Sequence, residues 1–196
     1  MRKIIFSLSV SVDGFFEGPD GEIDWHVVDD ELHQHMNSWL GRMGAFLSGR
    51  RTYALMAEYW PTADRDPAST GPEVEFAGIW REMPKIVYSS TLESAGWNTT
   101  IVRDVVVDEV LALKASPGGD LVVGGPDLAS AFRRHGLIDE YRLYVHPVLI
   151  GRGRPMFGPE DRRTDLDLIE TRTFGTGVVM QRYRVGGRLL SHGRHG

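Results

Sequence analysis

The sequence predicts a single α/β domain with a largely parallel sheet, and three observations lead to this prediction. Apolar runs with the length of strands alternate with runs of helical spacing along most of the chain. Residues 121–150 contain a strand, a glycine turn, a helix and a further strand, which is a βαβ unit. Strand patterns at 166–174 and 178–185 flank a Gly-Thr-Gly turn, which predicts an antiparallel hairpin at the carboxyl-terminal end of the sheet.

The composition is typical of one soluble globular domain. The chain has 196 residues, of which 41% are hydrophobic and 25% are charged. The net charge of −5 gives no overall attraction to nucleic acid or to an anionic membrane. Cysteine is absent, which excludes disulfides, zinc–thiolate sites and cysteine nucleophiles. No apolar run is long enough to span a bilayer, so we expect a cytoplasmic protein without a metal, membrane or nucleic-acid partner.

The first strand is expected at residues 3–10, where Ser7 and Ser9 interrupt the apolar run, so one side of it faces a site instead of the core. Residues 11–25 are expected to be a long loop whose aromatic residues pack over core or ligand. The other expected elements are helices at 29–43, 50–59, 73–82, 108–115 and from 126, strands at 45–48, 85–88, 99–102 and 138–150, and a surface loop at 60–72. Without a repeat or linker, the domain is expected to cover residues 1–186, followed by a disordered tail at 187–196.

Three strands of the expected sheet end in turns suited to phosphate. Residues 48–52 (Ser-Gly-Arg-Arg-Thr) follow one strand, 89–91 (Ser-Ser-Thr) follow the next, and Gly124-Gly125 follow a third. Because the carboxyl ends of parallel strands meet at one edge, these turns would lie side by side. Together they offer backbone N–H groups, hydroxyls, helix starts and guanidinium groups, which an extended phosphorylated cofactor needs. The usual GxGxxG dinucleotide fingerprint is not present.

Motifs along almost the whole chain give it a family resemblance. They are Ser11-Val12-Asp13-Gly14 with Trp25, then residues 49–53, then 88–90, and most specifically 123–126 with 137–140 and 146–153. The chain resembles the dihydrofolate reductase-like superfamily, in particular the reductase domain of bacterial riboflavin biosynthesis. The resemblance implies a dihydrofolate reductase-like α/β fold, a mostly parallel sheet flanked by helices, and an NADPH-dependent reductase that forms a homodimer.

The resemblance also implies which residues hold NADPH. The pyrophosphate and adenosine side would lie at the first two turns, and the nicotinamide would lie against the first strand and the loop after it. The implied residues are Leu8, Ser9, Phe16, Gly49, Arg50, Arg51, Thr52, Ser89, Ser90, Gly124, Gly125, Asp127 and Leu128. Folate reductases often place an arginine for the 2′-phosphate where this chain has Asp127, so a preference for NADPH over NADH rests on Arg50 and Arg51.

For the substrate, the resemblance implies Trp25, Asp30 and His146. Folate reductases place a carboxylate at the start of the first helix, where it binds the pterin and supports its protonation, and Asp30 has that spacing from Trp25. The residues alone favour a helix N-cap for Asp30, and Asp29 or Glu31 could exchange roles with it. His146 would line the substrate pocket and donate a proton, whereas a single strand histidine more often serves a backbone group.

The substrate itself is suggested by analogy. Folate is disfavoured because Met83-Pro84 stand where folate reductases carry an arginine. The best match is 5-amino-6-(5-phosphoribosylamino)uracil, whose phosphate Arg65 or Arg152 could bind, although plain surface solvation is the more common role of such residues. The alternatives are a dihydrofolate reductase and a non-catalytic binding domain of the same fold.

Overall fold

The computed structural model describes residues 1–158 and 163–186. Its helices are α1 (Asp30–Leu40), α2 (Arg50–Tyr59), the 3-10 helix η1 (Trp60–Arg65), α3 (Gly71–Glu82), α4 (Val107–Ala115) and α5 (Pro126–Arg134). Its strands are β1 (Ile4–Ser11), β2 (Phe15–Glu17), β3 (Ala45–Gly49), β4 (Lys85–Tyr88), β5 (Thr99–Val102), β6 (Leu121–Gly124), β7 (Glu140–His146), β8 (Arg154–Pro155), β9 (Leu166–Thr173) and β10 (Val179–Val185).

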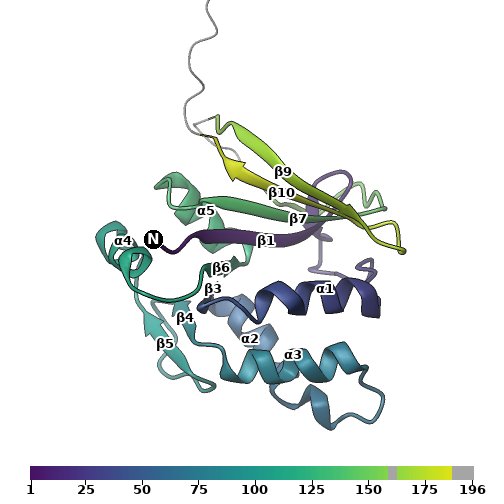
Figure 1. Ribbon diagram of the computed structural model, residues 1–196, viewed down its shortest axis with the longest axis horizontal. Helices are drawn as coiled ribbons and strands as arrows, with labels where there is room; N and C mark the ends of the chain where they lie inside the picture. Colours follow the sequence, from purple (N-terminus) through teal and green to yellow (C-terminus); the bar gives the residue numbers. More distant parts are fainter. Residues whose placement is uncertain (159–162, 187–196) are drawn as a thin grey trace, which may run out of the picture.

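Eight of the strands form one sheet in the order β5-β4-β3-β6-β1-β7-β10-β9 (Figure 1). The strands from β5 to β7 are parallel to one another. Strand β10 is antiparallel to both β7 and β9. The predicted sheet, mostly parallel with an antiparallel hairpin at its carboxyl-terminal end, is therefore confirmed.

The central strands have two different faces because successive side chains alternate across a sheet. On β1, Ile4 and Phe6 face the main core, where they join Leu47 of β3, Val123 of β6 and Phe132 of α5. The residues between them point to the opposite face, and several are small or polar: Ser7, Ser9, Ser48 and Gly124. The side chains of the central strands are therefore packed on one face of the sheet, while the small side chains on the other face leave open space.

Helices α1 and α3 lie together on the roomy side (Figure 1). Leu32 anchors α1 on the sheet by packing against Tyr144, Val178 and Met180. The side-chain amide of Asn37 donates to the carbonyl of Pro72 at 2.8 Å and so ties α1 to the start of α3. Among the described helices, none is both long and apolar enough to cross a membrane.

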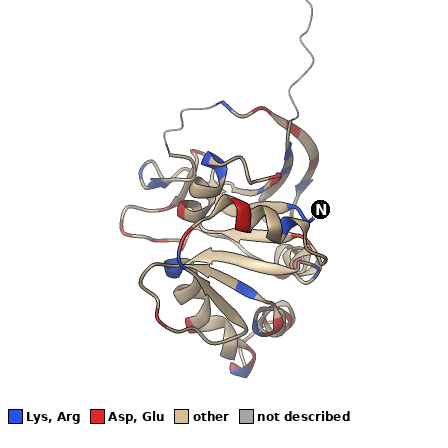
Figure 2. Ribbon diagram, turned by 90° about the vertical axis from the view of Figure 1, so that its left-hand side faces the viewer, with Lys and Arg blue, Asp and Glu red and all other residues tan. Residues whose placement is uncertain are grey.

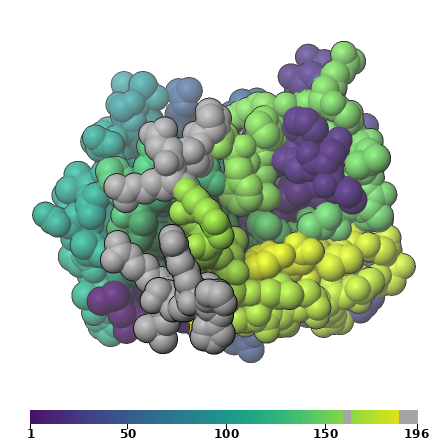
Figure 3. Space-filling model, turned by 90° about the horizontal axis from the view of Figure 1, so that it is seen from above, coloured from purple at the N-terminus to yellow at the C-terminus, as the bar shows by residue number. Residues whose placement is uncertain are grey.

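Several expected boundaries need correction. Residues 11–25 are not all loop, because β2 pairs with β8, so that segments far apart in sequence lie side by side (Figure 3). The segment 60–72 begins with η1, whose Pro61 and Ala63 are buried, instead of being a surface loop throughout. The strand expected at 138–150 is shorter and ends at His146. The tail expected at 187–196 lies outside the described residues.

Candidate functional site

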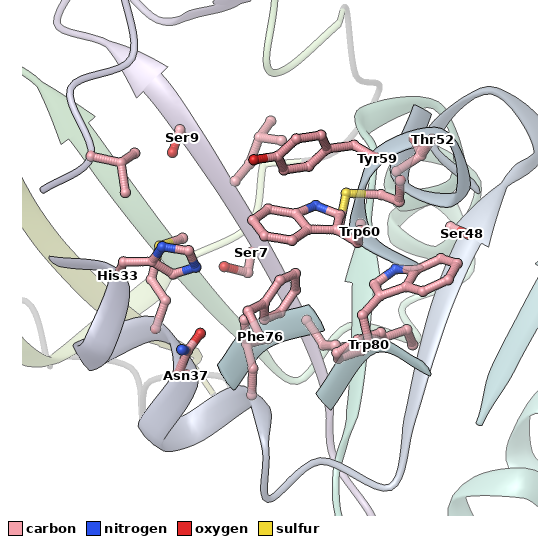
Figure 4. Close-up of a pocket in the computed structure, with 18 of the residues that line it drawn as sticks. Ser7, Ser9, His33, Asn37, Ser48, Thr52, Tyr59, Trp60, Phe76 and Trp80 are labelled. Carbon is pink, nitrogen blue, oxygen red and sulfur yellow. The ribbon is translucent and has the colours of Figure 1, made fainter. Parts of the chain in front are cut away.

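A cavity of about 590 Å³ lies between the second face of the sheet and the helices that cover it (Figure 4). This volume suits a small-molecule ligand. Ser7 and Ser9 line it, so they face an open cavity instead of the core. Its other lining side chains include Asp30, His33, Met36 and Asn37 of α1, Thr52, Tyr53, Met56 and Tyr59 of α2, Trp60 of η1, and Glu73, Phe76 and Trp80 of α3.

The three turns predicted to bind phosphate meet at one edge of the sheet, and two of them, 48–52 and 124–125, contribute residues to the cavity lining. Strands β4, β3 and β6 are neighbours, and Ser48 stands opposite Gly124 in register. Arg50 Nη1 donates to Thr91 Oγ1 at 3.1 Å and joins the turn after β3 to the turn after β4. The predicted convergence is confirmed, and we call residues 48–52, 89–91 and 124–125 the turn rim.

Two helices begin at the turn rim without a side-chain cap. Helix α2 follows Gly49 and α5 follows Gly125, and neither glycine can accept from the first-turn N–H groups through a side chain. Gly125 has a φ of +90°, and a Cβ there would lie 2.4 Å from Thr52 Oγ1. Only glycine fits this close approach. Uncapped helix starts beside Arg50 and Thr52 fit the phosphates of a dinucleotide.

The other residues implied for cofactor binding differ in exposure and in whether they line the cavity. Ser90 and Arg51 are exposed. The hydroxyl of Ser89 is buried and accepts from the backbone N–H of Leu92 at 3.0 Å, so it shapes its turn. Leu8, Ser9, Thr52, Gly124 and Gly125 line the cavity.

Asp127, Phe16 and Leu128 belong neither to the cavity lining nor to the turn rim. Asp127 forms an ion pair with Arg154 at 2.9 Å. Phe16 is buried below the guanidinium of Arg154, and Leu128 is buried in the main core. Their cofactor roles stay predictions.

The structure separates three adjacent carboxylates at the start of α1. Asp29 is the N-cap, since its Oδ1 accepts from the N–H of Leu32 at 2.9 Å. Glu31 accepts from the N–H of Gly175 and pairs with Arg172, and both contacts lower its pKa. Asp30 lines the cavity, and its side chain has no hydrogen-bond partner among the described residues. The interpretation of Asp30 as the cap is therefore wrong, while its substrate role stays a prediction.

His146 lies behind the cavity wall. It is fully buried, and its Nδ1 accepts from the N–H of Val27 at 3.1 Å, so the backbone-partner interpretation is confirmed. His26 stacks on its ring at a centroid distance of 5.0 Å, and Trp25 meets it edge-on at 5.7 Å. Burial lowers the pKa of His146 to about 4, with a smaller contribution from His26. His26 lines the cavity in its place, and the proton-donor role of His146 stays a prediction.

The sequence reasoning missed an aromatic cluster at the end of the cavity formed by α1, α2, η1 and α3. We call His33, Tyr59, Trp60 and Phe76 the aromatic end. The Trp60 ring lies 4.5 Å from Phe76, 4.9 Å from Tyr59 and 5.7 Å from His33 between centroids. Asp30, His33 and Asn37 are spaced i, i+3 and i+7, a pattern that could have indicated a shared helix face. No comparable sequence signal marked Trp60.

Metal ligands and charge do not define the site. Within residues 1–158 and 163–186, no group of three or more His, Asp or Glu side chains could hold a metal ion. Figure 2 shows basic and acidic residues mixed over the face in view. The local charges at the turn rim and in the cavity therefore matter more than an overall field.

Comparisons with solved structures give the fold. A Shewanella sp. PV-4 protein provisionally assigned to riboflavin biosynthesis superposes with a TM-score of 0.74 at 20% identity, covering 95% of this chain and all of its own. The Thermotoga maritima deaminase and 5-amino-6-(5-phosphoribosylamino)uracil reductase superposes with a TM-score of 0.63 at 15% identity, covering 94% of this chain and 57% of its own. The expected dihydrofolate reductase-like α/β fold is confirmed.

Sequence comparison gives the family. The uncharacterized protein YyaP of Bacillus subtilis (strain 168) is 35% identical over 187 residues, which cover 95% of this chain and 96% of YyaP. The family model of the RibD C-terminal domain matches residues 2–180. The chain therefore belongs to the RibD C-terminal domain family.

Proposed function

We propose that this protein is an NADPH-dependent reductase that transfers a hydride to a pyrimidine- or pterin-like small molecule. The observation that carries the proposal is that the turn rim opens into the same cavity as the aromatic end. A dinucleotide with its phosphates on the rim can extend along β1 into this cavity. When bound, NADPH supplies the hydride, and membership of a reductase-like family supports this assignment.

The protein's own residues would bind the cofactor and the substrate, orient their rings and exclude water. Gly49, Arg50, Arg51 and Thr52 would hold the phosphates, and Gly124 and Gly125 would let the cofactor pass close to the backbone. Asp30 would hold the polar edge of the substrate ring and support its protonation. The cavity walls would align the two rings, which is the main contribution a protein can make to hydride transfer.

The first candidate substrate is 5-amino-6-(5-phosphoribosylamino)uracil, which appears in the name of the Thermotoga maritima protein of the same fold. Dihydrofolate is the second candidate. A non-catalytic domain would be expected to fill its cavity with Trp25, Phe16 or Tyr53. Only Tyr53 of these lines the cavity, which remains open, so this observation favours a ligand-binding protein.

A thermal-shift measurement tests the cofactor. NADPH should raise the melting temperature of the wild-type protein, because a ligand that binds only the folded state stabilises it. Gly125→Trp should remove the rise, since any side chain there meets Thr52. Gly136→Trp is the matched control, because Gly136 also has a positive φ but nothing lies within 4 Å of the place that a Cβ would take. The absence of any rise with NADPH or NADH would contradict the proposal.

Turnover assays then separate the substrates. NADPH oxidation is followed at 340 nm, a general property of the nicotinamide, with 5-amino-6-(5-phosphoribosylamino)uracil or with dihydrofolate as acceptor. Faster turnover of dihydrofolate would reverse the preferred assignment.

We also propose that the protein is a cytoplasmic homodimer. Strand β9 forms one edge of the sheet, and Leu166, Leu168 and Ile169 are exposed on it. An exposed apolar edge strand is able to pair with a second copy. Size-exclusion chromatography with light scattering should give twice the chain mass, and cell fractionation should place the protein in the cytoplasm.

A further inference from the structure

The aromatic end of the cavity offers flat surfaces to a ring. His33, Tyr59, Trp60 and Phe76 come from three helical segments and a short 3-10 helix, and their rings point into the cavity (Figure 4). Trp60 meets Phe76 at 84° and Tyr59 at 75°, so the rings present edges as well as faces. The faces of Trp, Tyr and Phe carry negative electrostatic potential, which attracts a cation.

The charges beside these rings are negative. Asp30 and Glu73 both line the cavity. Glu73 accepts from the backbone N–H of Thr70 at 2.8 Å, a contact that holds its side chain in place. His33 lies close enough to Glu73, Asp30 and Glu75 for all three to raise its pKa, although burial has the larger effect and lowers it. A ligand at the aromatic end therefore meets carboxylates.

A counter-charge for a phosphate is missing from the lining. Lys85 is the one Lys or Arg among the cavity-lining residues that the structure describes. Its ammonium is buried and donates to the carbonyls of Trp80, Met83 and Trp97, the last at 2.8 Å. These contacts occupy all three donors of the ammonium. Arg65 and Arg152, the candidates for binding a substrate phosphate, are exposed and do not line the cavity.

We propose that the aromatic end binds a flat, cationic heteroaromatic ring without a phosphate group. This inference rests on the proposed reductase function for its relation to the cofactor. It narrows the substrate class to rings without a phosphate and therefore reverses the preference for 5-amino-6-(5-phosphoribosylamino)uracil that the Thermotoga maritima protein suggests. A ring cation would face aromatic surfaces and two carboxylates, both of which favour it. A phosphate in the same place would face the same carboxylates without a partner, which disfavours it.

Two pairs of small probes test the proposal on the wild-type protein by isothermal titration calorimetry at pH 7.5. The first pair, 1-methylquinolinium and quinoline, have nearly the same shape and differ in charge. The second pair, uridine and uridine 5′-monophosphate, differ in the phosphate. Each titration is done with NADP⁺ present, so that the turn rim is filled, and repeated without it.

We expect 1-methylquinolinium to bind at least 10-fold more tightly than quinoline, and the monophosphate to bind no more tightly than uridine. Equal binding of the quinoline pair, no binding of either quinoline, or a monophosphate that binds 10-fold more tightly than uridine with NADP⁺ present would each overturn the proposal. If NADP⁺ itself does not bind, the proposed reductase function fails, but the quinoline pair still decides the present inference.

A charge-removing variant adds a second, independent test. Asp30→Asn should weaken the binding of 1-methylquinolinium at least 5-fold and leave the binding of quinoline unchanged. Asp30 is exposed and its side chain makes no hydrogen bond within the described part of the chain, so the variant should fold. Glu58→Gln is the matched control, because Glu58 is an exposed carboxylate on α2 that does not line the cavity. Equal effects of the two substitutions on 1-methylquinolinium would contradict a specific role of Asp30.

Discussion

The two ends of the cavity are built in different ways. The turn rim consists of short local segments, each of which follows a strand, and its polar groups are backbone N–H groups, hydroxyls and Arg50. The aromatic end consists of side chains from α1, α2, η1 and α3, which touch only because the helices pack together. The rim therefore suits phosphates, whereas the aromatic end suits a flat ring.

The two ends also depend on different parts of the fold. Parallel strands place their carboxyl ends at one edge whatever the loops contain, so the rim is a consequence of the sheet. The aromatic end depends on contacts between helices, such as that of Asn37 with Pro72. The segment 25–28, from which His26 and Val28 line the same cavity, is held by a hydrogen bond from Val27 to His146. The aromatic end should thus be more sensitive to changes in packing, and the cavity wall at 25–28 should be sensitive to protonation of His146.

The largest effect that we expect is a loss of stability when the pH is lowered. The folded-state pKa of His146 is about 4, below its ordinary value of 6.5, so a proton binds the unfolded chain more tightly. The stabilising contribution is complete above about pH 6.5 and is lost as the pH falls toward 4. We expect the free energy of unfolding to fall by about 2 kcal/mol between pH 7 and pH 5. Urea denaturation at several pH values measures it.

Variants assign the acid effect to this histidine. His146→Asn should make the unfolding free energy less dependent on pH in this interval, even though the variant is less stable at pH 7. His135→Asn, which removes an exposed histidine at the end of α5, should keep the wild-type pH profile. If both variants keep that profile, the segment 25–28 does not depend on a neutral His146.

Substitution of Arg50 should have an intermediate effect, a loss of cofactor affinity at the turn rim. Arg50→Ala removes a guanidinium that joins two of the turns, and we expect NADPH to bind about 10-fold more weakly, as for loss of one charge-assisted contact. Binding of 1-methylquinolinium should not change. Arg134→Ala is the control, because Arg134 is exposed at the opposite end of α5. A loss of both ligands with Arg50→Ala would show that the two ends are not independent.

The sequence could predict the fold and the turn rim because both depend on local patterns. Strands, glycine turns and helix starts appear within a few residues of one another, and residues 48–52 and 124–125 carry the signal themselves. The aromatic end was missed because Trp60 stands in a segment whose composition is typical of a surface loop. The roles of Asp29, Asp30 and Glu31 were left open, since Glu31 meets Arg172, which is 141 positions away. Strand β2 pairs with β8 across a similarly long stretch of sequence.

Substitution of Asp127 should have the smallest effect, a change in how tightly the cofactor phosphates bind. Its carboxylate lies in the first turn of α5, beside the turn rim, and pairs with Arg154 in an exposed ion pair. Such pairs contribute little to stability, about 0–1 kcal/mol. Asp127→Asn should therefore leave folding nearly unchanged and, by removing a negative charge near the phosphates, strengthen NADPH binding about 3-fold at low salt.

High salt should abolish this gain because exposed charges are screened. Asp167→Asn, at an exposed carboxylate 4.0 Å from Arg184 in the hairpin, serves as the control and should not alter NADPH binding. Comparing NADPH with NADH shows whether the gain concerns the 2′-phosphate, since only NADPH carries that group. A gain of equal size for both cofactors would place Asp127 near the pyrophosphate instead. Weaker NADPH binding in Asp127→Asn would mean that this carboxylate helps the rim, through Arg154, and does not oppose the phosphates.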